Sequence, residues 1–304
     1  MSTFPRGSLL GIEQLQTEEI EGLLRLARRM QRPRTPSLLR GKIVGLVFYE
    51  PSTRTRTSFE IAAKKLGAST VVVHASGSSI EKGESLLDTG YTLQAVGCDV
   101  LVFRHTSAGA PHLIAAHLEI PVINAGDGMH EHPSQALLDA YTMLRHLKSL
   151  RGKRVSIVGD VYHSRVARSN VHLLSKLGAH ITLCGPPEFV PELAATLARG
   201  VRITRHLEEA VRGADVIMLL RVQKERLAEM RVDLGEYVAR YQLSLARLRL
   251  AKHETLVMHP GPIIRGMELS SEVADHPQAA IREEVQNGVA VRMAILARAV
   301  GKGR

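Results

Sequence analysis

Short apolar runs alternate along the chain with helix-length segments of mixed polarity. The runs are rich in Val, Ile and Leu and are bounded by polar or turn-forming residues, a pattern that predicts buried strands. Strands are expected at 43–48, 70–74, 100–103, 121–124, 155–158, 180–183, 216–220 and 256–258. Helices are expected between them, among others at 58–66, 85–96, 133–147 and 165–177. This alternation indicates parallel sheets covered by helices on both faces.

Both ends of the chain are predicted to be helical. Thr17 precedes two glutamates and an apolar series at helical spacing, which is typical of an N-cap and a first helical turn. Apolar residues recur about every four positions from Val285 to Val300, as in an amphipathic helix. The basic stretch 145–154 lies between a long helix and a new strand. We place a domain boundary there, near residue 150, so that each half holds about four strands, enough for one doubly wound domain.

Composition and charge help to decide between a nucleic-acid-binding protein, a membrane or secreted protein, and a cytoplasmic protein that binds small anions. The chain has 304 residues, a formal charge of +10 and only 4% aromatic residues. A basic chain is a candidate for nucleic-acid binding, but few aromatics means few stacking platforms, and attraction of small anionic substrates is the alternative. No apolar run approaches the roughly 20 residues of a membrane helix, and residues 1–7 lack the apolar stretch of a secretion signal. We therefore expect a cytoplasmic protein without a membrane partner, in which Cys98 and Cys184 are buried and unpaired.

Hydroxyl and cationic side chains gather after the first predicted strand. Residues 50–60 read Glu-Pro-Ser-Thr-Arg-Thr-Arg-Thr-Ser-Phe-Glu, and Ser52, Thr53, Arg54 and Thr55 lie where a strand leads into a helix. A helix N-terminus offers backbone N–H groups and a positive dipole end, to which hydroxyl and guanidinium donors add. A simple cap with solvated arginines would explain any one of these residues. Their density predicts a phosphate-binding site.

A second polar cluster follows the strand at 121–124. His132, Pro133, Ser134 and Gln135 open the next predicted helix, in which Pro suits the first turn. One helical turn places His132 and Gln135 on the same side, at the carboxyl end of a strand where ligands of α/β proteins usually bind. A histidine at a helix start is also commonly a cap, so the residues alone leave both roles open.

Three arginines stand just beyond predicted strands: Arg104, Arg165 through its loop, and Arg221. An arginine in such a place is costly unless it has an anionic partner. The positions indicate either a highly anionic ligand or pairing with structural carboxylates such as Glu50 and Asp215.

The turn after the strand at 155–158 contains one glycine, Gly159, where a dinucleotide fingerprint needs three. Binding of a nicotinamide cofactor is therefore not predicted.

Together these motifs resemble the aspartate and ornithine carbamoyltransferase family over about Gly41 to Arg298. Residues 52–56 and 132–135 resemble the carbamoyl-phosphate motifs of the whole family, in the same order and each at a strand end. The segments that separate the branches are similar to the aspartate branch: Ser78 with 82–85, then 221–226, then His259 to Pro262, where the ornithine branch carries His-Cys-Leu-Pro. One departure is Ile264, which stands where the aspartate branch commonly has Asn before Arg265-Gly266.

The resemblance implies a fold and a reaction. The fold would be α/β, with two doubly wound domains, each a parallel sheet flanked by helices, and an active site in the cleft between them. Residues 1–150 would bind carbamoyl phosphate and residues 151–304 aspartate, with the C-terminal helix, about 285–302, packing back on the first domain. The reaction would carry the carbamoyl group of carbamoyl phosphate to the α-amino group of L-aspartate, giving N-carbamoyl-L-aspartate and phosphate, the committed step of pyrimidine biosynthesis. No metal and no cofactor is implied.

The resemblance also assigns roles to individual residues. Those assigned to carbamoyl phosphate are Ser52, Thr53, Arg54, Thr55, Arg104, His132, Gln135, Gly261 and Pro262. Those assigned to aspartate are Lys82, Arg165, Arg221 and Gln223. The catalytic set is Arg54, Thr55, Lys82, Arg104 and His132, with Ser78 and Lys82 reaching in from a neighbouring subunit of a homotrimer. Glu50 would pair with an arginine of the second domain when the cleft closes.

Charge supports the aspartate branch, because Lys82, Arg165 and Arg221 suit two carboxylates whereas ornithine's cationic side chain would need an acidic pocket. The rivals are the ornithine branch and a catalytically inactive or nucleic-acid-binding relative that uses the +10 charge. Association with regulatory chains or a dihydroorotase, and cooperativity, are left open.

Overall fold

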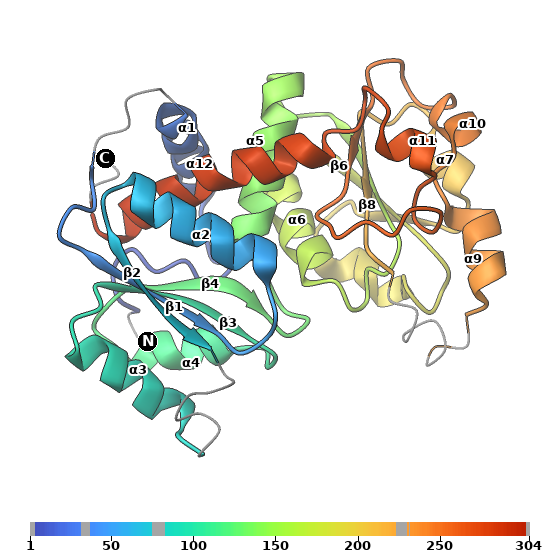
Figure 1. Ribbon diagram of the computed structural model, residues 1–304. Helices are drawn as coiled ribbons and strands as arrows, with labels where there is room; N and C mark the ends of the chain where they lie inside the picture. Colours follow the sequence, from blue (N-terminus) through green and yellow to red (C-terminus); the bar gives the residue numbers. More distant parts are fainter. Residues whose placement is uncertain (1–3, 32–36, 75–82, 223–229, 231, 302–304) are drawn as a thin grey trace. The chain divides into compact units, whose positions relative to one another are not determined.

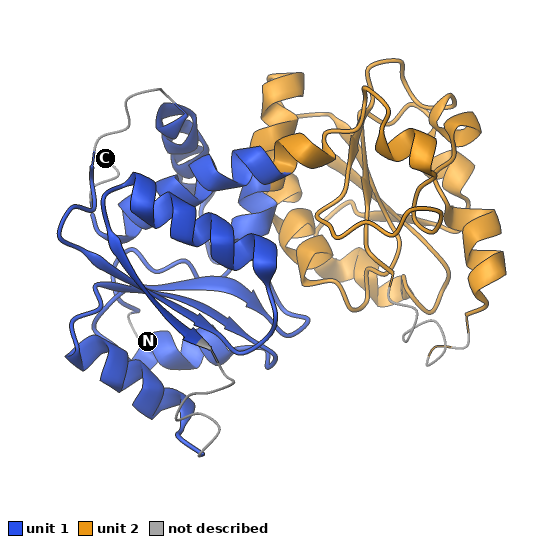
Figure 2. Cartoon of the chain, in the orientation of Figure 1, with its two compact units in different colours: residues 1–138, 285–304 blue, residues 139–284 orange. Residues whose placement is uncertain are grey.

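The computed structural model describes residues 4–31, 37–74, 83–222, 230 and 232–301 (Figure 1). It divides into two compact units (Figure 2). Unit 1 comprises residues 1–138 and 285–304, and unit 2 comprises residues 139–284. The division falls inside two helices, α5 (Pro133–Leu147) and α12 (Ile281–Ala299), so the predicted boundary near residue 150 lies within unit 2. The chain passes from one unit to the other within these two helices instead of through a polar linker.

Unit 1 is built on a parallel sheet of four strands in the order β2-β1-β3-β4. The strands are β1 (Ile43–Phe48), β2 (Ser69–His74), β3 (Val100–His105) and β4 (Val122–Asp127). The helices before α5 are α1 (Thr17–Met30), α2 (Thr53–Lys65), α3 (Leu86–Ala95) and α4 (Ala110–His117). In Figure 1, α3 and α4 cover one face of this sheet and α2 the other. Strands β1, β3 and β4 are thus largely buried on both faces, which explains their apolar runs, whereas Val71 and Val72 of the edge strand β2 are 40% and 36% exposed.

The core on the α3–α4 side of unit 1 joins strands to helices. Val47, Leu101 and Phe103 from β1 and β3 pack with Leu93 of α3 and Ile114 of α4, all of them buried. Burying such side chains contributes roughly 1.5–3 kcal/mol each. Cys98 belongs to the same cluster, and both cysteines are buried and free, as predicted.

Unit 2 contains a parallel sheet of five strands in the order β7-β6-β5-β8-β9. The strands are β5 (Arg154–Val158), β6 (His180–Cys184), β7 (Arg202–Thr204), β8 (Val216–Leu219) and β9 (Leu256–Met258). Its helical elements are α6 (Arg165–Lys176), η2 (Glu192–Leu197), α7 (Leu207–Val211), α9 (Leu234–Tyr241), α10 (Leu245–Leu248) and α11 (Ser271–Ala274). The prediction of two parallel sheets flanked by helices is confirmed.

Three local expectations need correction. Strand β7 was not predicted, because Arg202-Ile203-Thr204 is too short and polar for a clear apolar run. The helix expected from residue 58 begins at Thr53, so the hydroxyl-rich motif forms its first turn. At α1 the N-cap is Gln16, not Thr17, and the Glu19 carboxylate accepts from the Gln16 N–H at 3.0 Å.

Helix α12 is not amphipathic along its whole length. Val285, expected on the apolar face, is 53% exposed, whereas every residue from 290 to 297 is buried. Its part after residue 284 belongs to unit 1, in which Arg292 lies over the Phe59 ring at 5.2 Å and Arg298 bonds to Glu19 at 2.6 Å. These contacts lie within unit 1. In the described part of the chain, no helix is both long and apolar enough to cross a membrane.

Candidate active site

Helix α2 begins at the carboxyl end of β1 without a side-chain cap. Ser52 occupies the N-cap position, but its side chain makes no capping hydrogen bond, and the first turn contains no acidic residue. Thr53 and Arg54 are exposed there, whereas Thr55 is buried. Backbone N–H groups at such an end are normally satisfied by a cap, by water or by a ligand. This helix end therefore has the chemistry of an anion site.

Arg104 lies beside this helix end in the sheet. Its backbone is paired with Phe48, the last residue of β1. Its guanidinium lies 2.6 Å from the Glu50 carboxylate and donates to the Ala125 carbonyl at 3.2 Å. Both side chains of the ion pair are mostly buried. Arg104 is thus oriented by a carboxylate of its own unit, Glu50.

His132 and Gln135 open α5 after β4, and both side chains are buried. The Gln135 N–H donates to the His132 carbonyl at 2.9 Å, and Ser134 Oγ lies 3.4 Å from His132 Nδ1. The preceding turn is fixed by Glu131, whose buried carboxylate accepts from the N–H groups of Ile12 and Glu13 at 2.8–3.1 Å. The N-terminal segment therefore braces the turn that presents His132.

The topology brings the first set of predicted residues to one edge of a sheet. Strands β1, β3 and β4 are adjacent and parallel, and Ser52–Thr55, Arg104 and His132 stand at or just beyond their carboxyl ends. The set thus combines an open helix N-terminus, an arginine and a buried histidine, a suitable arrangement for a phosphate group bonded to a carbonyl group.

Unit 2 has a comparable edge. Strands β5, β8 and β9 are adjacent and parallel. Arg165 is the first residue of α6 after β5, Arg221 follows β8 and is exposed, and Gly261 and Pro262 follow β9. The Gly261–Pro262 peptide is cis. The cationic pair and the loop are placed where ligands of α/β sheets bind.

Glu268 joins two loops of this edge. Its buried carboxylate accepts from the Val222 N–H at 3.0 Å and from the Ile264 N–H at 2.9 Å. Burial raises the pKa of Glu268, and these two hydrogen bonds and the Arg221 charge only partly oppose that rise. Ile264, the departure from the branch pattern, is therefore held through its backbone. Glu268 was not among the predicted site residues, although its place between the apolar residues Met267 and Leu269 is a sign of a buried carboxylate.

A pair of buried carboxyl groups supports the loop after β9. Asp139 and Glu284 are 0% and 2% exposed, and a hydrogen bond joins them. Asp139 accepts from Asn170 Nδ2 at 2.8 Å, and Glu284 accepts from the His259 N–H at 2.9 Å. His259 Nδ1 in turn accepts from the Gly261 N–H at 2.8 Å. Two adjacent buried carboxyls can bond only if they share a proton, and burial beside Asp139 raises the pKa of Glu284 well above its usual range.

Gly159, in the turn after β5, is required by packing. Its φ is +121°, and a Cβ there would lie 3.1 Å from the Leu220 carbonyl oxygen. This glycine permits close approach of two strand ends, so it needs no dinucleotide to explain it.

Three predicted site residues, Ser78, Lys82 and Gln223, lie outside the described residues.

The chain matches two family descriptions over nearly its whole length. Residues 8–145 match the carbamoyl-phosphate-binding domain of aspartate/ornithine carbamoyltransferases, and residues 151–299 match the Asp/Orn-binding domain. Among curated relatives, the aspartate carbamoyltransferase catalytic subunit of Koribacter versatilis is 59% identical over 95% of each chain. That of Solibacter usitatus is 56% identical over 96% of this chain and 99% of its own.

Solved structures agree in fold. Aspartate transcarbamoylase from Trypanosoma cruzi, in complex with carbamoyl phosphate and aspartate, has a TM-score of 0.86 at 34% identity, covering 97% of both chains. Ornithine carbamoyltransferase from Pyrococcus furiosus has a TM-score of 0.87 at 27% identity, covering 99% of both chains. The fold is shared by both branches, whereas the sequence identities above are with the aspartate branch. The chain belongs to the aspartate/ornithine carbamoyltransferase family.

Proposed function

We propose that this chain transfers the carbamoyl group of carbamoyl phosphate to the α-amino group of L-aspartate, giving N-carbamoyl-L-aspartate and phosphate. The observation that carries the proposal is the 59% identity, over 95% of each chain, to a relative named aspartate carbamoyltransferase catalytic subunit. The product is the first pyrimidine-specific intermediate of the pathway that the family assignment implies.

Unit 1 would hold carbamoyl phosphate. The uncapped N-terminus of α2 supports a phosphate position at Ser52, Thr53, Arg54 and Thr55. Arg104, oriented by Glu50, would bridge the phosphate and the carbonyl oxygen. His132 would stabilise the developing oxyanion and Gln135 would hold the carbamoyl NH₂ group.

Unit 2 would hold aspartate. Arg165 and Arg221 have the charge to bind two carboxylates, with Lys82 and Gln223 as further donors. Gly261 and Pro262 would present backbone carbonyls to the incoming amine and the carbamoyl NH₂ group. The buried Glu268 and Glu284 carboxyls support these positions by fixing the backbone on either side of the loop.

The reaction requires one bond to form and one to break. The neutral amine of aspartate attacks the carbonyl carbon, the C–O bond to phosphate breaks, and the amine loses a proton as phosphate leaves. Positioning and oxyanion stabilisation by the named side chains would account for the rate enhancement.

Product analysis distinguishes aspartate carbamoyltransferase activity from ornithine carbamoyltransferase activity and from an inactive relative. The purified chain is incubated with carbamoyl phosphate and either aspartate or ornithine, and acid-stable carbamoylated product is measured. We expect N-carbamoyl-aspartate and no citrulline. Citrulline formation would establish the ornithine branch, and no product with either amine would indicate an inactive relative.

We further propose a cytoplasmic homotrimer in which Ser78 and Lys82 complete the active site of a neighbouring chain. The test uses hybrid trimers of Lys82→Ala and Arg54→Ala chains, each inactive alone. Mixing should restore activity, because some sites then combine an intact Arg54 from one chain with an intact Lys82 from the next. Hybrids that contain both chains and stay inactive would place Lys82 in its own subunit.

A further inference from the structure

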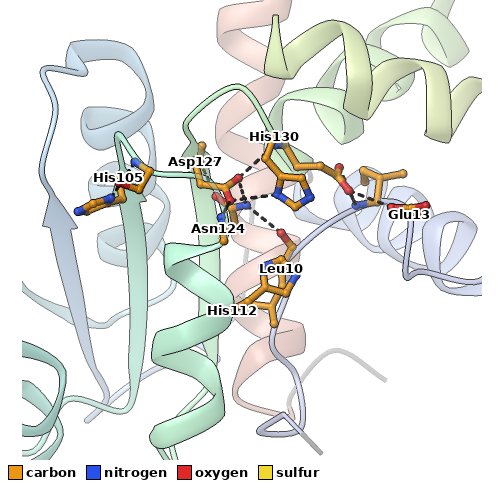
Figure 3. A network of polar contacts seen from close by, with 12 residues as sticks. Leu10, Glu13, His105, His112, Asn124, Asp127 and His130 are labelled. Atoms are coloured by element: carbon orange, nitrogen blue, oxygen red, sulfur yellow. Dashed lines mark hydrogen bonds and ion pairs between the residues drawn. The ribbon is translucent and has the colours of Figure 1, made fainter. Parts of the chain in front are cut away.

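A group of three potential metal ligands lies in unit 1 apart from the residues assigned to substrates. His112 belongs to α4, Asp127 ends β4, and His130 lies in the turn before α5. One ligand atom from each lies within 4.8 Å of the other two. Figure 3 shows the three side chains converging beside the N-terminal segment at Leu10.

Asp127 is the fixed member of the group. Its side chain is 0% exposed and accepts four hydrogen bonds. One oxygen accepts from Asn124 Nδ2 at 2.8 Å and from the Glu131 N–H at 3.1 Å. The other accepts from the Gly109 N–H at 2.7 Å and contacts His130 Nδ1 at 3.0 Å. A carboxylate oriented by backbone and amide donors is prepared to bind a cation without further reorganisation.

His112 provides an independent observation. Its Nδ1 atom is buried and has no hydrogen-bond partner among the described residues, while its Nε2 lies 2.8 Å from Gln14 Nε2. A buried imidazole nitrogen without a partner is uncommon and calls for a missing ion or water. If the Gln14 amide is turned over, its oxygen accepts from an Nε2–H and the lone pair of Nδ1 becomes available to a metal.

The spacing of the two rings fits a shared ion. The ring centroids of His112 and His130 lie 5.6 Å apart with an interplanar angle of 62°. Two imidazoles bound to one zinc ion at about 2.1 Å have centroids about 5 Å apart in tetrahedral geometry. An ion placed between His130 Nδ1 and the Asp127 carboxylate requires their 3.0 Å contact to open by a few tenths of an ångström.

We propose that His112, Asp127 and His130 bind one divalent transition-metal ion of the zinc class. Two imidazole nitrogens and one carboxylate oxygen form a ligand set that zinc accepts, with a water molecule in the fourth position. On binding, the ion displaces the proton between His130 and Asp127, which passes to solvent. The His130 side chain is 38% exposed, which gives the ion a path of entry.

The ion would act on structure, not on the chemical step. It would tie α4 and the end of β4 to the turn that leads to His132. The metal-site proposal is based on His112, Asp127 and His130 alone. It can therefore be tested independently of the proposed reaction.

The test measures zinc directly. The untagged full chain is freed of metal by chelation, dialysed against ZnCl₂, and its bound zinc is measured by elemental analysis. The variants are His112→Gln and His130→Gln, and the matched control is His117→Gln, because His117 lies in the same helix as His112 and its Nδ1 lies 2.8 Å from the Leu113 carbonyl oxygen of that helix. We expect about one zinc per chain for the wild type and the control, with affinity at least tenfold weaker in both ligand variants.

X-ray absorption of the zinc-loaded wild type tests the ligands without any substitution. We expect two imidazoles and additional oxygen ligands. The proposal is overturned if the wild type binds no zinc, if all four proteins bind it equally, or if the bound zinc has no imidazole ligands.

Discussion

The polar edges of the two sheets are positioned by different means. In unit 1, Ser52 is the N-cap and Thr53–Thr55 begin helix α2, and Arg104 is paired with Glu50, which follows the adjoining strand β1. In unit 2, the loops at Arg221 and His259 are held by the buried carboxylates Glu268 and Glu284, 46 and 25 residues away in sequence from the N–H groups they accept. The first edge is thus built mainly from local structure and the second from distant buried acids. Substitutions at the first edge should cost activity alone, whereas substitutions that break the hydrogen bonds of the second edge's supports should also cost stability.

The largest effect is expected at the locally built edge. Arg54→Ala should lower kcat by a factor on the order of 10³ or more, because it removes a cation from the leaving phosphate. Because Arg54 is exposed, the free energy of unfolding should change by less than about 0.5 kcal/mol. Steady-state kinetics and urea unfolding measure both quantities.

The matched control is Lys64→Ala, at the far end of α2, where Lys64 forms an exposed ion pair with Glu60. This control should keep wild-type turnover. Near-normal turnover in Arg54→Ala would contradict the phosphate site, and a large loss of stability would contradict the idea that this edge is locally built.

The second effect tests the division of substrates between the units. Arg221→Ala should raise the KM for aspartate by roughly 10- to 100-fold, since a charge-assisted hydrogen bond contributes about 1.5–3 kcal/mol. The KM for carbamoyl phosphate should change far less. Equal damage to both constants, measured with each substrate varied in turn, would refute the carboxylate role.

This contrast also explains what the sequence could and could not reveal. The parallel sheets were predictable because strands buried on both faces leave apolar runs in the sequence, and the partly exposed β2 was predictable because it is rich in Val. The motif at 52–55 was recognisable because its residues are contiguous and open a helix. Strand β7 left no such run, and its short, polar sequence gains a strand conformation only by pairing with β6.

The supports of unit 2 could not be predicted in the same way. Nothing local to Glu268 indicates which N–H groups it accepts, because Val222 and Ile264 approach it only after β8 and β9 have paired. The Asp139–Glu284 hydrogen bond likewise joins residues of α5 and α12 that are remote in sequence. A single sequence shows the acidic residues but does not show which backbone or side-chain groups they contact in the fold.

The third prediction tests that non-local support. Glu268→Gln should lower the free energy of unfolding by about 1–3 kcal/mol, because the amide NH₂ would face one of two backbone donors. It should also raise the KM for aspartate, since the loops at Val222 and Ile264 lose a common anchor. Denaturant unfolding measures the loss, with the exposed Glu236→Gln as control. Wild-type stability in Glu268→Gln would mean that the carboxylate is not an anchor.

The smallest effect concerns the shared proton of Asp139 and Glu284. The groups acting on Glu284 are the Asp139 carboxyl, the His259 N–H and the charge of Glu283, and burial raises its pKa well above the ordinary value. The folded chain therefore keeps a proton that the unfolded chain releases above about pH 4.3. The stabilising contribution is fully present below that pH and falls as the pH rises toward the folded pKa, by at most about 1.4 kcal/mol per pH unit.

Glu284→Gln should remove this pH dependence while preserving the geometry. The glutamine amide can donate to the Asp139 carboxylate permanently and still accept from the His259 N–H, so activity should remain near that of the wild type. Between pH 5.5 and pH 8, the variant should gain free energy of unfolding relative to the wild type, by up to about 1.4 kcal/mol for each pH unit below the folded pKa of Glu284. The exposed Glu254→Gln, in the same unit, should show no such gain. If the stability of Glu284→Gln depended on pH as that of the wild type does, Asp139 and Glu284 would share no proton.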